Sequence, residues 1–222
     1  MKFLLLSFFL FVLSLQAAAV DLQAPEEISE ALGLPQTRYT AQVRSLAEFQ
    51  QVEAMNIFSE FPIVLVINKK ASGPGAQRMK VYEYGKLVAE WKTSTGRERW
   101  ETAKSGRTYF TGTPTGYYYP YELIRNGWSE TWDAPMDFSV FFNGGVAVHA
   151  TTSNHYSELG YRASGGCVRL HRNNASYIYE RILQEGRGLV PIINQSGIVS
   201  RDRYGRPLRA VKWRTLIVVE DI

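Results

Sequence analysis

The pattern of apolar and polar positions divides the chain into a helical start and a strand-rich remainder. Residues 26–32 predict a short helix that Gly33 and Pro35 would end. Residues 43–58 place apolar side chains at three-residue spacing, which predicts a helix with one apolar stripe. From residue 62 onward the pattern is typical of strands.

Three segments carry the clearest strand patterns. Residues 63–68 form a continuous apolar run, as expected for a strand buried on both faces. Residues 78–91 alternate about a Gly-Lys turn and predict a hairpin. Residues 138–149 predict a second hairpin, because Asn143-Gly144 supplies the positive φ values that a tight turn needs.

The last quarter of the chain mixes one helix with further strands. Asn173 or Asn174 can cap a helix over residues 175–184, and a strand is predicted at 189–194. Residues 198–220 predict a terminal hairpin about a Gly-Arg-Pro turn. The fold class is therefore mainly β (α+β), with one helix in the second half and a helical extension at the start.

The first nineteen residues have the form of a secretory signal peptide. Met1-Lys2 is a short positive start, residues 3–15 are almost entirely apolar, and residues 16–19 offer small side chains for cleavage. The apolar run is shorter than the roughly twenty residues that span a bilayer. We therefore expect export to the periplasm or outside the cell, with no stable membrane insertion after cleavage.

Composition narrows the possible functions. The chain has 222 residues and a formal net charge of +4, which is too weak and too evenly spread to indicate nucleic-acid binding. One Cys excludes an intramolecular disulfide and a Cys-rich zinc site. The three His lack the close spacing of a typical zinc motif, so we predict neither a metal site nor a cofactor.

Cys167 is the strongest candidate for chemistry. It follows Ser164-Gly165-Gly166, a polar and flexible stretch, whereas a structural thiol would sit among apolar neighbours. Glycines allow backbone N–H groups to approach a substrate closely, and such groups stabilise the oxyanion formed when a thiolate attacks a carbonyl. We expect Cys167 to be a nucleophile in a pocket open to solvent; a small buried residue is the alternative.

A thiol with an ordinary pKa near 8.5 needs a base or a nearby positive charge, and His149 is the preferred partner. It ends the predicted hairpin strand, where its side chain can face a cleft. His155, in the polar loop that follows, remains an alternative. His171 is a third candidate, which would suit the role only if residues 167–171 were helical.

Arg169 lies two residues after Cys167, so both side chains point to one face if the segment is extended. A guanidinium there would bind a carboxylate through two hydrogen bonds, with a solvated surface charge as the alternative.

These residues resemble the L,D-transpeptidase (YkuD-type) family of cell-wall enzymes. The likeness rests on Val148-His149-Ala150-Thr151 and on the motif at residues 163–170, Ala-Ser-Gly-Gly-Cys-Val-Arg-Leu. The segments at 95–96, 113–116 and 142–145 also look like family landmarks, and the resemblance covers about residues 62–195.

The resemblance implies a role for each matching residue. Cys167 would be the nucleophile, His149 its base, and Ser164 would orient the loop. Gly166 and Cys167 would supply the oxyanion N–H groups, and Arg169 would meet a carboxylate of the substrate. Many relatives have His where this chain has Gly165, so no role of that His carries over.

Three further contacts to the substrate are expected. The aromatic stretch at residues 117–132, which includes Tyr119, is a candidate wall or lid for a stem peptide, with core packing as the alternative. Thr151 follows the predicted base closely, and Gly165 borders the nucleophile, so both are assigned to substrate binding.

The resemblance further implies a peptidoglycan L,D-transpeptidase, and hence a role in cell-wall biogenesis and cell shape. The thiolate would be acylated by a tetrapeptide stem with release of D-Ala, and the acyl group would pass to an amine on a second stem, a lipoprotein or a D-amino acid. Hydrolysis of the same thioester, a general cysteine peptidase and a non-catalytic peptidoglycan-binding module remain alternatives. Either way the protein would be associated with the cell wall.

The expected organisation has four parts: a signal peptide at 1–19, an N-terminal helical extension at 20–60, a catalytic domain at 61–196 with a YkuD-like sandwich of mixed sheets, and a C-terminal β-hairpin at 197–222 packed on that domain.

Overall fold

The computed structural model describes residues 24–40, 42–129 and 134–222. The predicted signal peptide lies outside these residues. The helices are α1 (Pro25–Leu32), α2 (Leu46–Glu53), α3 (Ile57–Glu60) and α4 (Arg172–Glu185), with a short 3-10 helix η1 (Ser153–Glu158).

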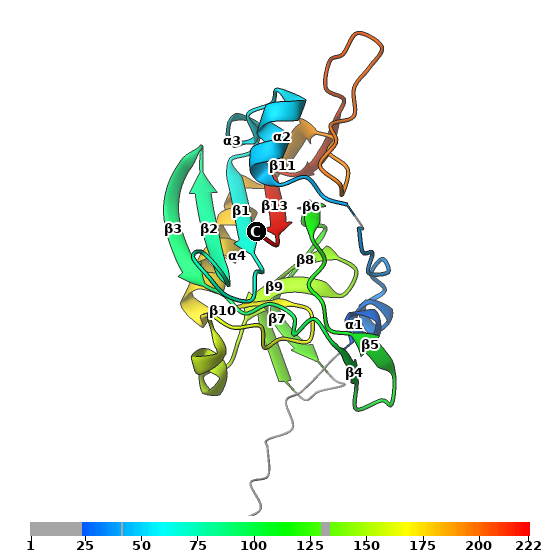
Figure 1. Ribbon diagram of the computed structural model, residues 1–222, viewed down its shortest axis with the longest axis vertical. Helices are drawn as coiled ribbons and strands as arrows, with labels where there is room; N and C mark the ends of the chain where they lie inside the picture. Colours follow the sequence, from blue (N-terminus) through cyan, green and yellow to red (C-terminus); the bar gives the residue numbers. More distant parts are fainter. Residues whose placement is uncertain (1–23, 41, 130–133) are drawn as a thin grey trace, which may run out of the picture.

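Two β-sheets form the body of the molecule (Figure 1). The five-stranded sheet has the order β3 (Lys86–Lys92), β2 (Arg78–Glu83), β1 (Ile63–Asn68), β13 (Thr215–Glu220), β6 (Gly116–Tyr118). The four-stranded sheet has the order β10 (Val168–Leu170), β9 (Val146–Ala150), β8 (Ala134–Asn143), β7 (Glu122–Ser129). Two ribbons complete the described strands, β4 (Trp100–Thr102) with β5 (Thr108–Phe110) and β11 (Arg187–Pro191) with β12 (Arg209–Trp213).

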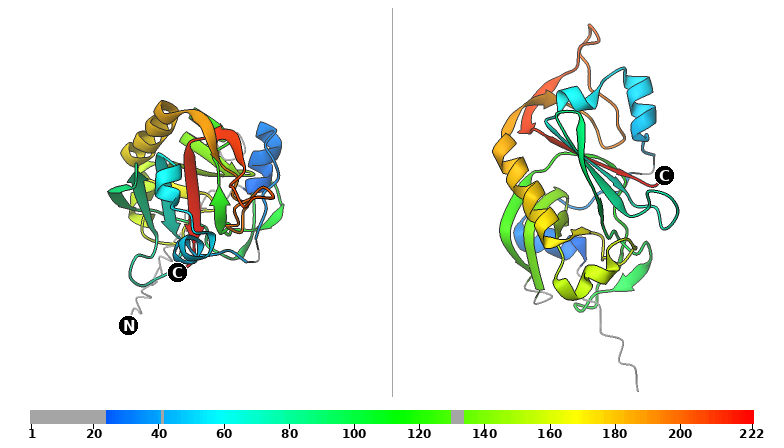
Figure 2. Two further views of the ribbon diagram at one scale, coloured as in Figure 1. Left: turned by 90° about the horizontal axis from the view of Figure 1, so that it is seen from above. Right: turned by 90° about the vertical axis from the view of Figure 1, so that its left-hand side faces the viewer.

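The side-chain alternation along the strands explains how the layers pack. One face of each sheet contributes to a shared core, in which Leu65 and Ile217 meet Val148 and Val168. Helix α4 packs on β8 and β9 and adds Ile178 to this core (Figure 2). The mainly β prediction is therefore confirmed, with the helix in the expected place.

The outer faces of both sheets are covered by the N-terminal segments. The far face of the five-stranded sheet carries Val64 and Leu216, which pack against Phe49 of α2 and Ile57 of α3. The far face of the four-stranded sheet is covered by α1, whose Ile28 is buried there. In Figure 1 α1 accordingly lies beside the β4–β5 ribbon at the lower end, whereas α2 and α3 lie at the upper end.

Two of the three predicted helices are present with shifted ends, and the third is divided in two. Helix α1 ends at Leu32, as expected, and Gly33 follows as a left-handed C-cap with φ of 64°. The helix expected over residues 43–58 is instead broken at Ala54, which adopts a left-handed conformation with φ of 48°. Helix α4 begins earlier than expected, because the ring of His171 accepts a hydrogen bond from Asn173 N–H and caps the helix.

The predicted terminal hairpin is wrong in the pairing of its strands, although its turn is present, with Arg201 bridged to Pro207. Strand β13 leaves its sequence neighbours and inserts between β1 and β6, running parallel to β1 with Leu65 opposite Ile217. The segment before it pairs elsewhere, since β12 joins β11. The chain end therefore supplies a central strand of the larger sheet.

The structure contains no helix, among the residues it describes, that is long and apolar enough to cross a membrane.

Candidate active site

The side chains of Cys167, His149 and Arg169 share the outer face of the four-stranded sheet. Val148 and Val168 pair in register across β9 and β10 and point into the core. Their neighbours along each strand must therefore point to the opposite face. The structure thus brings together the predicted nucleophile, base and carboxylate-binding residue, with His149 directly opposite Arg169.

The tautomer of His149 follows from its hydrogen bond. Nδ1 lies 2.8 Å from the carbonyl oxygen of Ala150. Because a carbonyl can only accept, Nδ1 carries the proton and Nε2 keeps its lone pair. A backbone carbonyl therefore orients the imidazole, and Nε2 is the atom that can take a proton.

Arg169 is paired within the protein. Its Nη1 donates to Oε2 of Glu158 at 2.8 Å, and 12% of its side chain is exposed. The same glutamate is also hydrogen-bonded to the ring of His155, whose Nδ1 lies 2.8 Å from Glu158 Oε1. The partner of Arg169 is thus a carboxylate of the chain itself, and the binding of a substrate carboxylate stays a prediction.

The loop before Cys167 is held by Ser164, as the resemblance implied. The Ser164 hydroxyl donates to the carbonyl of Cys167 and accepts from the N–H of Gly166 at 3.1 Å. Gly166 has φ of +135°, a conformation that favours glycine. Since its N–H is already bonded to Ser164, Cys167 N–H is the better oxyanion donor of the expected pair.

The thiol is buried, against the expectation of an open pocket. Cys167 is 8% exposed and packs with Phe141, Ala147 and Ile28. Its Sγ donates to the carbonyl of Gly145 at 3.6 Å, so the thiol proton does not point to the imidazole in this state.

Residues 24–39, here called the cover segment, cause this burial. A methyl group placed on Gly145 would lie 1.8 Å from the Pro25 carbonyl oxygen, so only glycine allows such close contact. The Asn143 side chain accepts from Arg38 N–H at 3.0 Å and donates to the Arg38 carbonyl at 2.6 Å. On its outer side Glu30 pairs with Arg107 of the β4–β5 ribbon at 3.0 Å.

Burial sets the protonation states in this covered form. It raises the pKa of the Cys167 thiol to about 11, against smaller lowering effects of an Ala147 backbone bond and of Arg169. Burial, together with Arg169, lowers the pKa of His149 to about 4. Near neutral pH the pair is therefore a neutral thiol and a neutral imidazole, and ionisation must accompany the reaction.

The other predicted residues are placed differently. Tyr119 is not part of the site: its hydroxyl donates to Pro191 O at 2.6 Å and accepts from Ile193 N–H at 2.8 Å, in the core on the far face of the larger sheet. The described part of the aromatic stretch, residues 117–129, contributes to β6 and β7. Thr151 lines a cavity of about 260 Å³ beside the end of β9, together with Tyr156 and Arg172, and its role in substrate binding stays a prediction.

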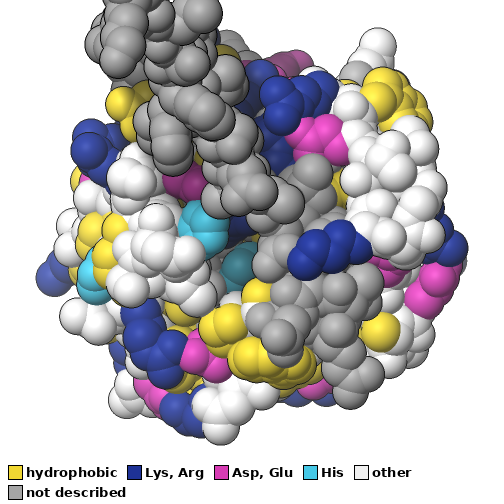
Figure 3. All heavy atoms as spheres, turned by 90° about the horizontal axis from the view of Figure 1, so that it is seen from below, with side chains coloured by type: hydrophobic (Ala, Val, Ile, Leu, Met, Phe, Trp, Pro, Cys, Tyr) yellow, Lys and Arg dark blue, Asp and Glu magenta, His cyan; other side chains and the backbone are white. Residues whose placement is uncertain are grey.

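The lower end of the molecule in Figure 1, which Figure 3 shows from below, carries charges of both signs. Figure 3 shows histidine side chains there, with basic and acidic side chains interspersed and not gathered into one patch. Gly165 is half-buried in the loop before Cys167, and no contact assigns it a role of its own.

Sequence reasoning missed the residues that support the loop before Cys167. Gln77, which is fully buried, accepts from Thr95 N–H at 2.8 Å and donates to Thr95 Oγ1 at 2.8 Å. Thr95 O in turn accepts from Ser164 N–H at 2.9 Å. The Thr-Gly pair at 95–96 was the only signal, because an isolated Gln resembles a surface residue.

Comparison with known families matches residues 62–194, more than half of the chain, to the YkuD L,D-transpeptidase catalytic domain. The chain belongs to this family. No match was found among curated proteins.

Solved structures of L,D-transpeptidases show limited likeness. One from Xylanimonas cellulosilytica is 21% identical, with a TM-score of 0.47, over 87% of this chain and 68% of that one. One from Mycobacterium smegmatis is 16% identical, with a TM-score of 0.46, over 72% and 59%. L,D-transpeptidase 3 from Mycobacterium tuberculosis, solved with a faropenem-derived adduct, is 15% identical, with a TM-score of 0.44, over 72% and 61%.

Proposed function

We propose that this YkuD-family chain is an exported peptidoglycan L,D-transpeptidase that works through a thioester on Cys167. The observation that carries the proposal is the shared sheet face of Cys167, His149 and Arg169, with His149 Nε2 free to act as a base. The family match supports the reaction class, and the proposed substrate is the tetrapeptide stem of the cell wall.

Acylation begins when the thiol proton turns from Gly145 towards the imidazole. His149 Nε2 takes this proton as Sγ attacks the carbonyl carbon that precedes the terminal D-Ala. The oxyanion faces Cys167 N–H. The C–N bond then breaks, the amine of D-Ala takes the proton from His149, and the acyl group remains on sulfur as a thioester.

Transfer reverses these proton movements. An amine of a second stem attacks the thioester carbon and loses a proton to His149. The C–S bond breaks and the thiolate is protonated again by the imidazolium. Peptide-bond energy is conserved through the thioester, so no external energy source is needed. In this proposal Arg169 binds a carboxylate of the donor stem. This carboxylate replaces that of Glu158, with which Arg169 is paired in the covered state.

Access to sulfur requires the cover segment to move. Ile28 and the Pro25 carbonyl occupy the space beside Cys167 that an acyl donor needs. Helix α1 has eight residues and lies outside the core shared by the two sheets, so it can detach without unfolding the molecule. We propose that substrate binds the form in which α1 has moved away.

The direct test is turnover of a purified disaccharide tetrapeptide by the full chain. We expect release of D-Ala together with cross-linked dimer, and no product from Cys167→Ser. Tripeptide monomer alone would identify a hydrolase, and binding without any D-Ala release would identify a non-catalytic module. Either result would contradict transpeptidation.

A further inference from the structure

Thr113 forms a hydrogen bond to the loop before Cys167 that has no role in the mechanism proposed above. Its Oγ1 donates to the carbonyl oxygen of Gly166 at 2.6 Å and accepts from Gly96 N–H at 2.9 Å. Thr113 is fully buried, so water does not compete for either bond. The hydroxyl therefore ties the peptide that precedes Cys167 to a neighbouring segment of the chain.

The planarity of the peptide bond gives this contact a consequence for chemistry. The carbonyl of Gly166 and the N–H of Cys167 belong to one peptide unit, and in a trans peptide they point in opposite directions. Fixing the carbonyl on the Thr113 side therefore fixes the direction of the N–H. A hydrogen bond at the carbonyl also polarises the unit and strengthens the N–H as a donor.

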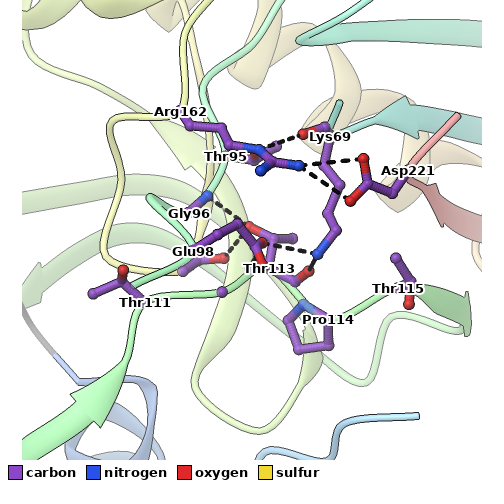
Figure 4. Close-up of polar contacts among 12 residues, drawn as sticks. Lys69, Thr95, Gly96, Glu98, Thr111, Thr113, Pro114, Thr115, Arg162 and Asp221 are labelled. Carbon is purple, nitrogen blue, oxygen red and sulfur yellow. Dashed lines mark hydrogen bonds and ion pairs between the residues drawn. The ribbon is translucent and has the colours of Figure 1, made fainter. Parts of the chain in front are cut away.

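An ion pair holds Thr113 in place (Figure 4). Lys69 Nζ donates to Glu98 Oε1 at 2.8 Å and to the Thr113 carbonyl at 2.8 Å. The same oxygen of Glu98 accepts from Thr113 N–H at 3.1 Å. Lys69 thus binds the backbone carbonyl of Thr113 and Glu98 binds its backbone N–H. These two bonds fix the residue with its hydroxyl directed at Gly166.

Both residues of the Lys69–Glu98 ion pair are held in unfavourable states, which indicates that the pair serves a specific structural role. Lys69 is 7% exposed, and a buried ammonium is costly unless it is paired. Glu98 holds a positive φ of 56°, which is uncommon for a residue with a side chain. Arg162 adds a further brace, since its Nε donates to the Lys69 carbonyl at 2.8 Å.

We propose that Thr113 is a positioning residue for the oxyanion donor, Cys167 N–H, and that Lys69 and Glu98 hold Thr113 for this task. The inference rests on the proposed role of Cys167 as nucleophile. The additional claim is that these residues speed up attack on a carbonyl, in which an oxyanion forms, and leave the reactivity of the thiol itself unchanged.

The experiment compares two reactions of the same thiol in the full chain. Imipenem acylates a thiolate by carbonyl attack and so forms an oxyanion, whereas iodoacetamide alkylates it by displacement and forms none. Both need the cover segment to open, so this factor cancels to first order in the ratio of the two rates. We expect Thr113→Val to lower the acylation-to-alkylation ratio by about 10- to 100-fold, and Thr113→Ser to restore most of it.

Thr111→Val is the matched control. Its Oγ1 also donates to a carbonyl and accepts from an N–H, both of Arg99, at 2.8 and 3.2 Å, and it is equally buried. This variant loses the same kinds of bond without touching Gly166, so its ratio should stay within about twofold of wild type. Glu98→Gln tests the other end of the network and should lower the ratio by a smaller factor, even if Thr113→Val fails to fold.

The possible results separate the two proposals. Acylation of wild type with an unchanged ratio in Thr113→Val and Glu98→Gln would overturn the positioning role alone. An equal fall in Thr111→Val would also overturn it, because general loosening of the segment would then explain the effect. Alkylation of wild-type Cys167 without any acylation would overturn the proposed function, and this inference with it.

Discussion

The cover segment makes a quantitative prediction about thiol reactivity. Ile28 is 3% exposed and packs with Phe141, Ala147 and Cys167, so Ile28→Ala removes most of the apolar contact between α1 and the sheet. Truncation of a buried Ile to Ala costs about 2–5 kcal/mol. Because α1 lies outside the main core, we assign this cost to local detachment of the helix, with global unfolding affected little.

The lower figure is the appropriate one for a short helix with an exposed outer side. About 2 kcal/mol corresponds to an increase of roughly 30-fold in the open population. When closing is faster than the chemical step, the rate of modification is proportional to that population. We therefore expect iodoacetamide to alkylate Cys167 of Ile28→Ala about 30 times faster than wild type.

The assay is intact-mass spectrometry at timed intervals with excess iodoacetamide at neutral pH. Leu32→Ala is the matched control, since Leu32 lies on the same helix with 43% exposure. It should alkylate within about twofold of wild type. Circular dichroism melting should show that the main transition survives in both variants.

An alkylation rate of Ile28→Ala equal to that of wild type would refute the reasoning. So would an equal increase in Leu32→Ala, because loss of helix stability would then be the cause and contact with the thiol would not.

Three further predictions concern the proposed base, His149, and the loop before Cys167. His149→Gln should slow acylation of Cys167 by imipenem at least about 100-fold with the fold retained, and a fall of only a few-fold would exclude His149 as the base. The lowered pKa of His149 makes the unfolded chain bind more protons between pH 6.5 and about 4, so its contribution is complete above pH 6.5 and lost on acidification. Urea unfolding should therefore show wild type losing up to roughly 3 kcal/mol more than His149→Gln between pH 7 and 4; equal losses would contradict the buried neutral imidazole. Ser164→Ala, which leaves Gly166 N–H and the Cys167 carbonyl unsatisfied, should lower unfolding stability by about 1–3 kcal/mol and slow acylation. Wild-type values for both would show that Ser164 does not hold the loop.

Local patterns in the sequence predict much of the fold. The apolar run of β1 predicts burial on both faces, and both faces are covered in the structure. The alternation around Cys167 correctly predicts that Arg169 shares its face, because a strand places every second side chain on one side.

The position of β13 could not be predicted in this way. Its sequence, Thr-Leu-Ile-Val-Val-Glu, signals a strand but carries no information about its partner. A hairpin with the preceding segment is the simplest local choice. Pairing with β1, far away in the sequence, depends on the shape of the whole core, and a parallel pair leaves no turn signal between its strands.

The burial of the site escaped prediction for a similar reason. The pattern of residues 26–32 predicts a helix but not the surface on which it lies, so the contact between Ile28 and Cys167 could not be foreseen. Lys69 and Glu98 likewise resemble isolated surface charges, and only the fold reveals that they pair. Long-range contacts decide both cases.

The nucleophilic role of Cys167 is tested most directly by imipenem and the intact mass of the full chain, followed by peptide mapping. We expect one covalent adduct per chain on Cys167, formed faster in Ile28→Ala and absent from Cys167→Ser. A wild-type chain that stays unmodified, or carries its adduct on another residue, while iodoacetamide still alkylates Cys167, would contradict that role.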